Sequence, residues 1–211
     1  MKCRNLLLAV TATLLLSAQA FAGAPKSNAM DEFDPSSPDA ERILEDMDAE
    51  YERATGKSPF LETPSLSLKS MFGIQDCKRT ECAVFLDINK STQKADLYEN
   101  GVVTRTFKIS SGKQGHSTPN YNGHPTGRIY DAHQSSRYPG GEVYIDGKNM
   151  GNMPYAVFFK TLYAVHGTLS VSKLGTRASH GCVRMHTDNA RIFNRLVRAN
   201  GIANVYMSVH D

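Results

Sequence analysis

The chain has 211 residues, with 24 Lys and Arg against 21 Asp and Glu, and a formal net charge of +3 at pH 7. Two of the positive charges, Lys2 and Arg4, lie in a leader-like segment, so the rest is close to neutral and lacks the basic block that binds nucleic acid. Beyond the leader no stretch approaches the roughly 20 apolar residues that a membrane span needs. We therefore expect a globular protein with neither a nucleic-acid partner nor a membrane span.

The first 22 residues have the pattern of a secretory signal peptide. Lys2 and Arg4 precede an apolar run over residues 6–16, and Ala20-Phe21-Ala22 follows as a small-residue cleavage site. The pattern predicts cleavage before Gly23 and a periplasmic or secreted protein. An uncleaved anchor is the alternative, which the cleavage site disfavours.

Residues 23–80 are expected to form a linker and a helical extension. Residues 23–38 are rich in Pro, Ser, Ala and Asp, a composition that favours a disordered tether. The spacing of four apolar residues then predicts an amphipathic helix over 39–55 that ends at Gly56. Such an apolar stripe more often packs on its own domain than on a partner. The four residues are Ile43, Leu44, Met47 and Tyr51.

Residues 81–211 are expected to form one mainly β domain. Asn100-Gly101 predicts a tight hairpin turn, and Thr187 is a plausible N-cap of one late helix that ends at Asn200-Gly201. Many short strands with one late helix predict a β-sandwich or a partly closed barrel. The expected strands cover residues 83–88, 94–98, 102–110, 128–131, 143–145, 156–159, 162–165 and 203–209.

Three cysteines remain beyond the leader. An oxidising exterior favours pairing, and Cys77 and Cys82 are close enough in sequence to form a disulfide across a tight turn. Two unrelated buried thiols are the alternative, because spacing alone does not fix disulfide geometry. Pairing of these two would leave Cys182 as an odd thiol that needs an explanation.

Cys182 and His166 are candidates for a nucleophile and its base. A cysteine reacts as its thiolate, so it needs a proton acceptor and donors for the charge that develops on the attacked carbonyl. His166 ends a β-type run, and Cys182 ends a glycine-containing loop in which the amides of Gly181 and Cys182 are suited to an oxyanion hole. Taken singly, a lone histidine and a free cysteine are more often structural. Their combination makes catalysis the better interpretation.

The residues around this pair carry a family resemblance. His166-Gly167-Thr168, followed by Ser179-His180-Gly181-Cys182-Val183-Arg184-Met185, resembles the signature of the L,D-transpeptidase catalytic domain, also called the YkuD domain. The segments 153–159 and 188–190 extend the resemblance, which runs from about residue 82 to the C-terminus. Residues 23–80 match nothing in the family.

The resemblance implies a β-sandwich-like fold and a cysteine acyltransferase without a cofactor or metal. Cys182 would attack the carbonyl that precedes a terminal D-alanine in a peptidoglycan stem tetrapeptide, release the D-alanine and hold the peptide as a thioester. An amine would then accept the acyl group, from a stem peptide, a D-amino acid or an outer-membrane lipoprotein. The resemblance implies that the Gly167 carbonyl orients His166. The substrate contacts that it implies are Met153, Tyr155, Ser179, His180 and Arg184, although a structural ion pair is as plausible for Arg184.

Two segments depart from the family pattern. Residues 110–128 form an expanded turn, and residues 131–147, rich in Tyr, Gly and Ser, are expected to form a flap over the site or an ordinary surface loop. Both would affect the choice of acceptor.

Three other functions compete with transfer. A hydrolase of the same family, a carboxypeptidase or endopeptidase, would use water in place of the amine. A zinc site at His180, Cys182 and His186 is disfavoured because no matching ligand pair occurs elsewhere. A non-catalytic wall-binding module is disfavoured because both Cys182 and His166 are present.

Overall fold

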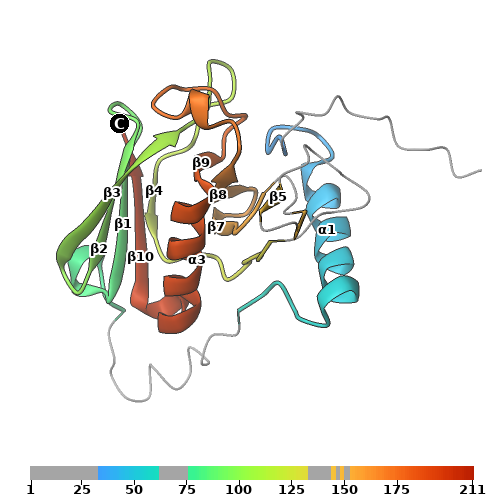
Figure 1. Cartoon of the computed structure of the whole chain (residues 1–211), viewed down its shortest axis with the longest axis horizontal. Coiled ribbons are helices and arrows are strands. Elements are labelled where there is room, and N and C mark those ends of the chain that lie inside the picture. The colour runs from blue at the N-terminus through green and yellow to red at the C-terminus, as the bar shows by residue number, and fades with distance from the viewer. Residues whose placement is uncertain (1–32, 62–75, 133–143, 146–147, 150–152) are drawn as a thin grey trace, which may run out of the picture.

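The structure is a computed structural model that describes residues 33–61, 76–132, 144–145, 148–149 and 153–211 (Figure 1). The expected signal peptide and most of the expected flap at 131–147 lie outside the described residues. Within the described ranges, no helix is long and apolar enough to cross a membrane.

The domain is built on one eight-stranded sheet with the strand order β4-β10-β1-β2-β3-β9-β8-β7. Neighbouring strands are antiparallel except for two parallel pairs, β1 with β10 and β8 with β9. The strands are β1 (Val84–Asn89), β2 (Lys94–Glu99), β3 (Val102–Ser110), β4 (Tyr121–Gly123), β7 (Val157–Lys160), β8 (Tyr163–Thr168), β9 (Val183–His186) and β10 (Val205–His210), and a separate pair is β5 (Tyr144–Ile145) with β6 (Lys148–Asn149).

The sheet curls into a nearly closed barrel. Its two edge strands approach each other, with the ring of Tyr121 in β4 5.4 Å from that of Phe159 in β7. The outer edge of β7 is covered by the chain near residue 129, where Phe158 N–H donates to Arg128 O (3.1 Å) and Tyr130 N–H donates to Ala156 O (2.9 Å). Closure leaves little exposed sheet edge on this side.

The barrel encloses the main core, and one helix packs against it. Apolar residues from seven of the strands fill the interior, and Ala190, Phe193 and Val197 of α3 (Thr187–Asn200) join the same cluster. The remaining helical turns are 3₁₀ segments: η1 (Arg79–Glu81), η2 (Val171–Lys173) and η3 (Ile202–Asn204).

The N-terminal helix α1 (Ala40–Thr55) forms a second buried cluster on the outer side of the sheet. Figure 1 shows it in blue beside β7 and β8, on the far side of these strands from β1 to β3. Its apolar stripe packs with Phe158, Ala164 and Cys182, and it ends at Gly56, whose φ of 67° is left-handed. The residues of the stripe are Ala40, Leu44, Met47 and Tyr51.

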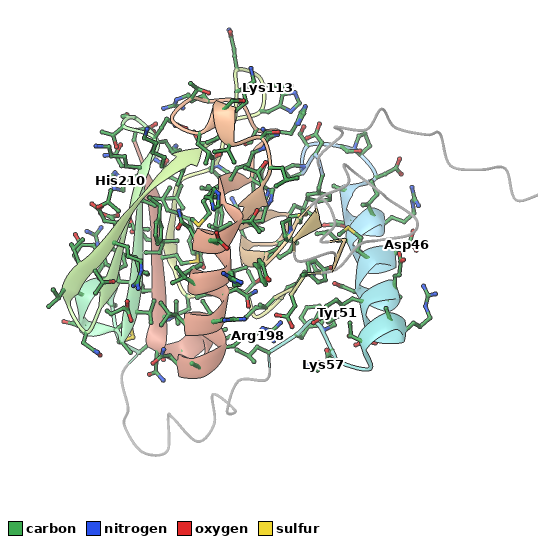
Figure 2. All side chains as sticks on the ribbon, in the orientation of Figure 1. Asp46, Tyr51, Lys57, Lys113, Arg198 and His210 are labelled. Carbon is green, nitrogen blue, oxygen red and sulfur yellow. A yellow bond between two sulfur atoms is a disulfide. The ribbon has the colours of Figure 1, made fainter. Side chains whose placement is uncertain are left out.

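Polar side chains fasten α1 to the barrel. Tyr130 donates its hydroxyl to Asp48 of α1, and Arg128 lies 3.0 Å from the same carboxylate. Figure 2 shows Tyr51 of α1 and Arg198 of α3 near each other; both reach Asp131, at 3.4 Å and 3.1 Å. The helix is therefore an integral part of the fold.

Most of the predicted elements are present. The mainly β class, the near-closure and both helices are confirmed, and six of the expected strands differ from those observed only at their ends. The expected strand 128–131 is wrong, because Arg128 and Ile129 form only isolated bridges with Phe60 and Val157. The helix α3 begins at Thr187 with His186 as N-cap, since His186 Nδ1 accepts from the Asp188 amide.

Two strands of the sheet are absent from the sequence prediction. The first is β4, whose three residues are too few for a recognisable alternation. The second is β9, which separates Cys182 from α3, although the sequence indicated a loop leading directly into the helix. Residues 33–38 also differ from the expected tether, because Phe33 and Pro35 are buried.

Candidate active site

Parallel pairing of β8 and β9 brings His166 and Cys182 to one face of the sheet. His166 is in register with Arg184, and Val165 is in register with Val183. Since side chains alternate along a strand, Cys182, two residues before Arg184, shares the face of His166, while Val183 faces the barrel core. The imidazole of His166 and the thiol of Cys182 therefore lie on the same side of neighbouring strands.

The His166 ring is buried and its orientation is fixed. Its Nδ1 lies 2.9 Å from the carbonyl oxygen of Gly167. A carbonyl can only accept, so Nδ1 carries a proton, and in the neutral ring Nε2 presents a lone pair. Gly167 is itself held, because its amide donates to Pro154 O (2.8 Å) and a Cβ there would lie 2.8 Å from Thr187 Cα. A neutral imidazole with a basic Nε2 suits a general base.

Cys182 is the free thiol among the described residues, and it is 1% exposed. Cys77 and Cys82 are joined in a disulfide. The Cys182 sulfur lies 3.9 Å from Leu162 O. Burial, followed by the nearby charges of Cys182 and Asp34, raises the pKa of the Tyr163 hydroxyl.

Two hydroxyl groups shape the loop in front of the nucleophile. Ser179 is buried; its Oγ donates to Cys182 O and accepts from the Gly181 amide at 3.0 Å. Thr118 Oγ1 donates to Gly181 O (2.7 Å) and accepts from the Gly112 amide (2.9 Å). The Gly181 amide is thus engaged inside the loop, so its expected role in an oxyanion hole stays a prediction that requires this bond to lengthen.

The structure brings two of the expected substrate contacts, Arg184 and Met153, to the Cys182 face. Arg184 is 8% exposed, and burial lowers the pKa of its guanidinium. Met153 belongs to the same buried cluster as Cys182. His180 is half-buried, with Nε2 2.8 Å from Lys113 Nζ. Tyr155 packs instead against the barrel core, with a left-handed φ of 58°, and is not brought to this face.

Several residues of this region were not individually predicted as site residues, although the expanded turn as a whole was expected to affect the choice of acceptor. Lys113, His116 and Thr118 come from the expanded turn that departs from the family pattern. Asp34 and Pro35 come from the segment expected to be a tether, and Tyr163 lies inside a strand with no distinguishing neighbour. Their proximity follows from the way in which separate parts of the chain fold together. In the part of the chain that the structure describes, no group of three or more His, Cys, Asp or Glu could hold a metal ion.

Comparison with known proteins points to one family. The model of the L,D-transpeptidase catalytic domain family (YkuD) matches residues 83–205. A curated relative, the probable L,D-transpeptidase YbiS of Escherichia coli K12, is 31% identical over 67 residues, which are 32% of this chain and 22% of the relative. The alignment therefore spans about a fifth of that protein.

Solved structures of L,D-transpeptidases are similar to this chain, at low sequence identity. An L,D-transpeptidase from Mycobacterium smegmatis is 21% identical, with 62% of this chain and 59% of that chain covered and a TM-score of 0.47. L,D-transpeptidase 3 from Mycobacterium tuberculosis, in complex with a faropenem-derived adduct, is 19% identical, with 62% and 61% covered and a TM-score of 0.48.

Proposed function

Because the chain belongs to the L,D-transpeptidase catalytic domain (YkuD) family, we propose that it is a peptidoglycan acyltransferase with Cys182 as nucleophile and His166 as base. One observation carries the proposal: a free thiol and an imidazole with a fixed tautomer share one face of the β8–β9 pair. A non-catalytic wall-binding module would have no use for this arrangement.

In the first half of the reaction, His166 Nε2 takes the proton of the Cys182 thiol. The thiolate attacks the carbonyl that precedes the terminal D-alanine of a stem tetrapeptide, and the developing oxyanion is held by backbone amides such as that of Cys182. The tetrahedral intermediate collapses, the C–N bond breaks, and the imidazolium returns the proton to the leaving amine. Free D-alanine departs and a thioester remains.

In the second half, an amine attacks the thioester. Nε2 accepts a proton from the attacking amine, an amide bond forms, and the sulfur leaves as a thiolate that is protonated by the imidazolium. The acceptors that we propose are a stem peptide, a D-amino acid or an outer-membrane lipoprotein. The protein would meet them in the periplasm or outside the cell, after removal of residues 1–22.

Hydrolysis by the same site is the second candidate. It differs only in the acceptor, since water would release a tripeptide in place of a new amide. The family to which the chain belongs is described by its transpeptidase chemistry, which supports transfer.

The product distribution tests this function. Purified protein is incubated with tetrapeptide muropeptides, with and without a D-amino acid, and the products are separated and weighed by liquid chromatography with mass detection. Wild type is expected to release D-alanine and form the exchanged product, and Cys182→Ala is expected to form neither. A Cys77→Ser/Cys82→Ser variant, which removes two other sulfurs, serves as the control and should retain turnover.

Two outcomes would change the assignment. Turnover by Cys182→Ala would disprove the thioester mechanism. Only tripeptide from wild type, even with the D-amino acid in excess, would identify a hydrolase.

A further inference from the structure

Residues 33–36, here called the covering segment, lie over the nucleophile loop. Phe33 is 6% exposed and belongs to the buried cluster that holds Cys182 and the α1 stripe. Pro35 is buried against Gly181, where an added Cβ would lie 3.0 Å from Pro35 Cγ. Gly181, the residue that precedes Cys182, is thus covered by Pro35 from the N-terminal part of the chain.

Asp34 of the covering segment reaches a cluster of basic side chains. Its Oδ1 lies 3.5 Å from His116 Nδ1, and Ser36 Oγ lies 3.2 Å from the same nitrogen. The His116 ring meets the His180 ring edge-on at 5.0 Å, and Lys113 Nζ lies 2.8 Å from His180 Nε2. Lys113, at the top of Figure 2, comes with His116 from the expanded turn, while His180 directly precedes Gly181.

The environment of Asp34 favours its anionic form. Partial burial raises its pKa, but hydrogen bonds from the Ser36 hydroxyl and amide, together with the nearby His116 and His180, outweigh this and hold the pKa below its ordinary value. Asp34 is also close enough to Tyr163 to raise the pKa of that hydroxyl, as Cys182 does. Asp34 directly precedes Pro35, which packs on Gly181, so a carboxylate of the chain itself lies near the nucleophile.

A donor stem peptide brings a carboxylate of its own to this region. The peptide bond that Cys182 would attack is followed by a single D-alanine, so the reacting carbonyl lies one residue from a terminal carboxylate. With Pro35 on Gly181 and Cys182 1% exposed, the donor peptide and the covering segment cannot occupy this surface together. The contacts that hold the segment are noncovalent and can be exchanged.

We propose that Lys113, His116 and His180 form a carboxylate-binding subsite beside Cys182, and that Asp34 and Pro35 occupy it as an internal ligand which the donor's carboxylate displaces. The part played by the donor rests on the proposed function. Only molecules in which the segment is displaced can bind substrate. The apparent Kd for substrate is therefore the intrinsic Kd divided by the fraction of such molecules. The segment also shields the thiol when no donor is present.

The first test measures access to the thiol and needs no turnover. Cys182 of the protein without residues 1–22, which contain Cys3, is labelled with iodoacetamide under native conditions, and the adduct is followed by intact mass. Asp34→Asn keeps the shape of the side chain but removes its charge, and is expected to label about two- to fivefold faster, the effect of losing one partly exposed ion pair. Glu45→Gln, on the exposed side of α1, removes a charge without touching the cluster and should label at the wild-type rate.

The second test measures competition. Asp34→Asn should lower KM for a tetrapeptide muropeptide by a similar factor with little change in kcat, whereas Lys113→Met and His116→Gln should raise KM. When the terminal carboxylate of the muropeptide is converted to a carboxamide, Lys113→Met and His116→Gln should change its KM little.

The two tests separate the covering segment from the proposed function. An unchanged labelling rate of Asp34→Asn would overturn the proposal that the covering segment is an internal ligand. A raised KM for Asp34→Asn would also overturn it, because Asp34 would then help to bind the substrate. Equal effects of Lys113→Met on carboxylate and carboxamide would overturn the subsite. If no muropeptide is turned over, the proposed function fails while the labelling result still decides whether the segment covers Cys182.

Discussion

The imidazole of His166 donates from Nδ1 to the carbonyl oxygen of its own neighbour, Gly167, 2.9 Å away. This bond leaves Nε2 of the neutral ring as the basic nitrogen. The orientation of the base therefore depends on the backbone at Gly167, which is pressed against the first residue of α3.

A methyl group at Gly167 should disturb the base. In Gly167→Ala the new Cβ would lie 2.8 Å from Thr187 Cα, so the end of β8 or the start of α3 must move. We expect a loss of about 1–3 kcal/mol in the free energy of unfolding and at least a tenfold loss in kcat. Urea denaturation and muropeptide turnover measure the two effects. Leu169→Ala, at an exposed position just beyond β8, should leave both near wild type, and normal kcat in Gly167→Ala would argue against this control of the base.

A carbapenem should acylate Cys182, because its strained amide resembles the donor carbonyl and leaves no amine to depart. Intact-mass measurement is expected to show one adduct on wild type and none on Cys182→Ala. An adduct on the alanine variant, or an unmodified wild type at high drug concentration, would contradict the assigned nucleophile. Asp34→Asn should react faster than wild type if the covering segment also limits access of the drug.

Loss of the hydroxyl of Tyr130 should weaken the attachment of α1. Tyr130→Phe removes the hydroxyl that donates to the half-buried carboxylate of Asp48 and leaves the contact with Arg128. An unsatisfied buried acceptor costs about 1–3 kcal/mol in the free energy of unfolding, which urea denaturation would detect. Tyr98→Phe removes a hydroxyl from β2, far from α1, and should be nearly neutral. Equal stability of the two variants would mean that the Tyr130 bond contributes little.

The pH dependence of stability should reveal the burial of Asp48. Burial raises its pKa above the usual 3.8, although Tyr130 and Arg128 act in the opposite direction. Because the folded-state pKa is the higher one, the folded protein binds this proton more tightly and is destabilised by its loss. The stability of wild type relative to Asp48→Asn should therefore fall as pH rises from about 3.8 through the raised pKa and stay level above it. A difference that grows with pH would have the wrong sign.

Removal of the disulfide should cost moderate stability but no activity. Cys77 and Cys82 are five residues apart, so their bond closes a short loop, and chain-entropy arguments give about 2 kcal/mol for it. Cys77→Ser/Cys82→Ser should unfold at correspondingly lower urea. Peptide mapping of wild type without reductant should show this bridge with Cys182 reduced, and a bridge to Cys182 in active protein would contradict the assignment.

The sequence predicted the parts of the fold whose signals are local. The hairpin at Asn100-Gly101 and the stripe of α1 follow from short-range turn chemistry and helical spacing, and both are present. In β9, Val183 and Met185 alternate with Arg184, but four residues after a glycine loop carry too weak a period to distinguish a strand from a loop. The segment 128–131 has strand composition, yet it pairs only at isolated bridges.

The covering segment escaped prediction for a different reason. The prediction of a tether was based on the mostly polar composition of residues 23–38. It gave no weight to Phe33 and Pro35, whose contacts suffice to hold a short segment on a folded surface. That surface is made of residues from 153–182 and α1, and no local pattern encodes it. The resemblance that marked Cys182 and His166 likewise contained nothing about what lies over them.

The parallel partner of β1 is β10, which also pairs with β4, so a central strand of the barrel comes from residues 205–210. Until those residues are available, β1 lacks one neighbour and β4 lacks its attachment to the sheet. A chain emerging from the ribosome or from a membrane channel therefore cannot complete the barrel before residues 205–210 have passed through. This order of assembly would keep the chain threadable during the proposed export, and would delay a closed catalytic face until the protein reaches the compartment in which its substrate lies.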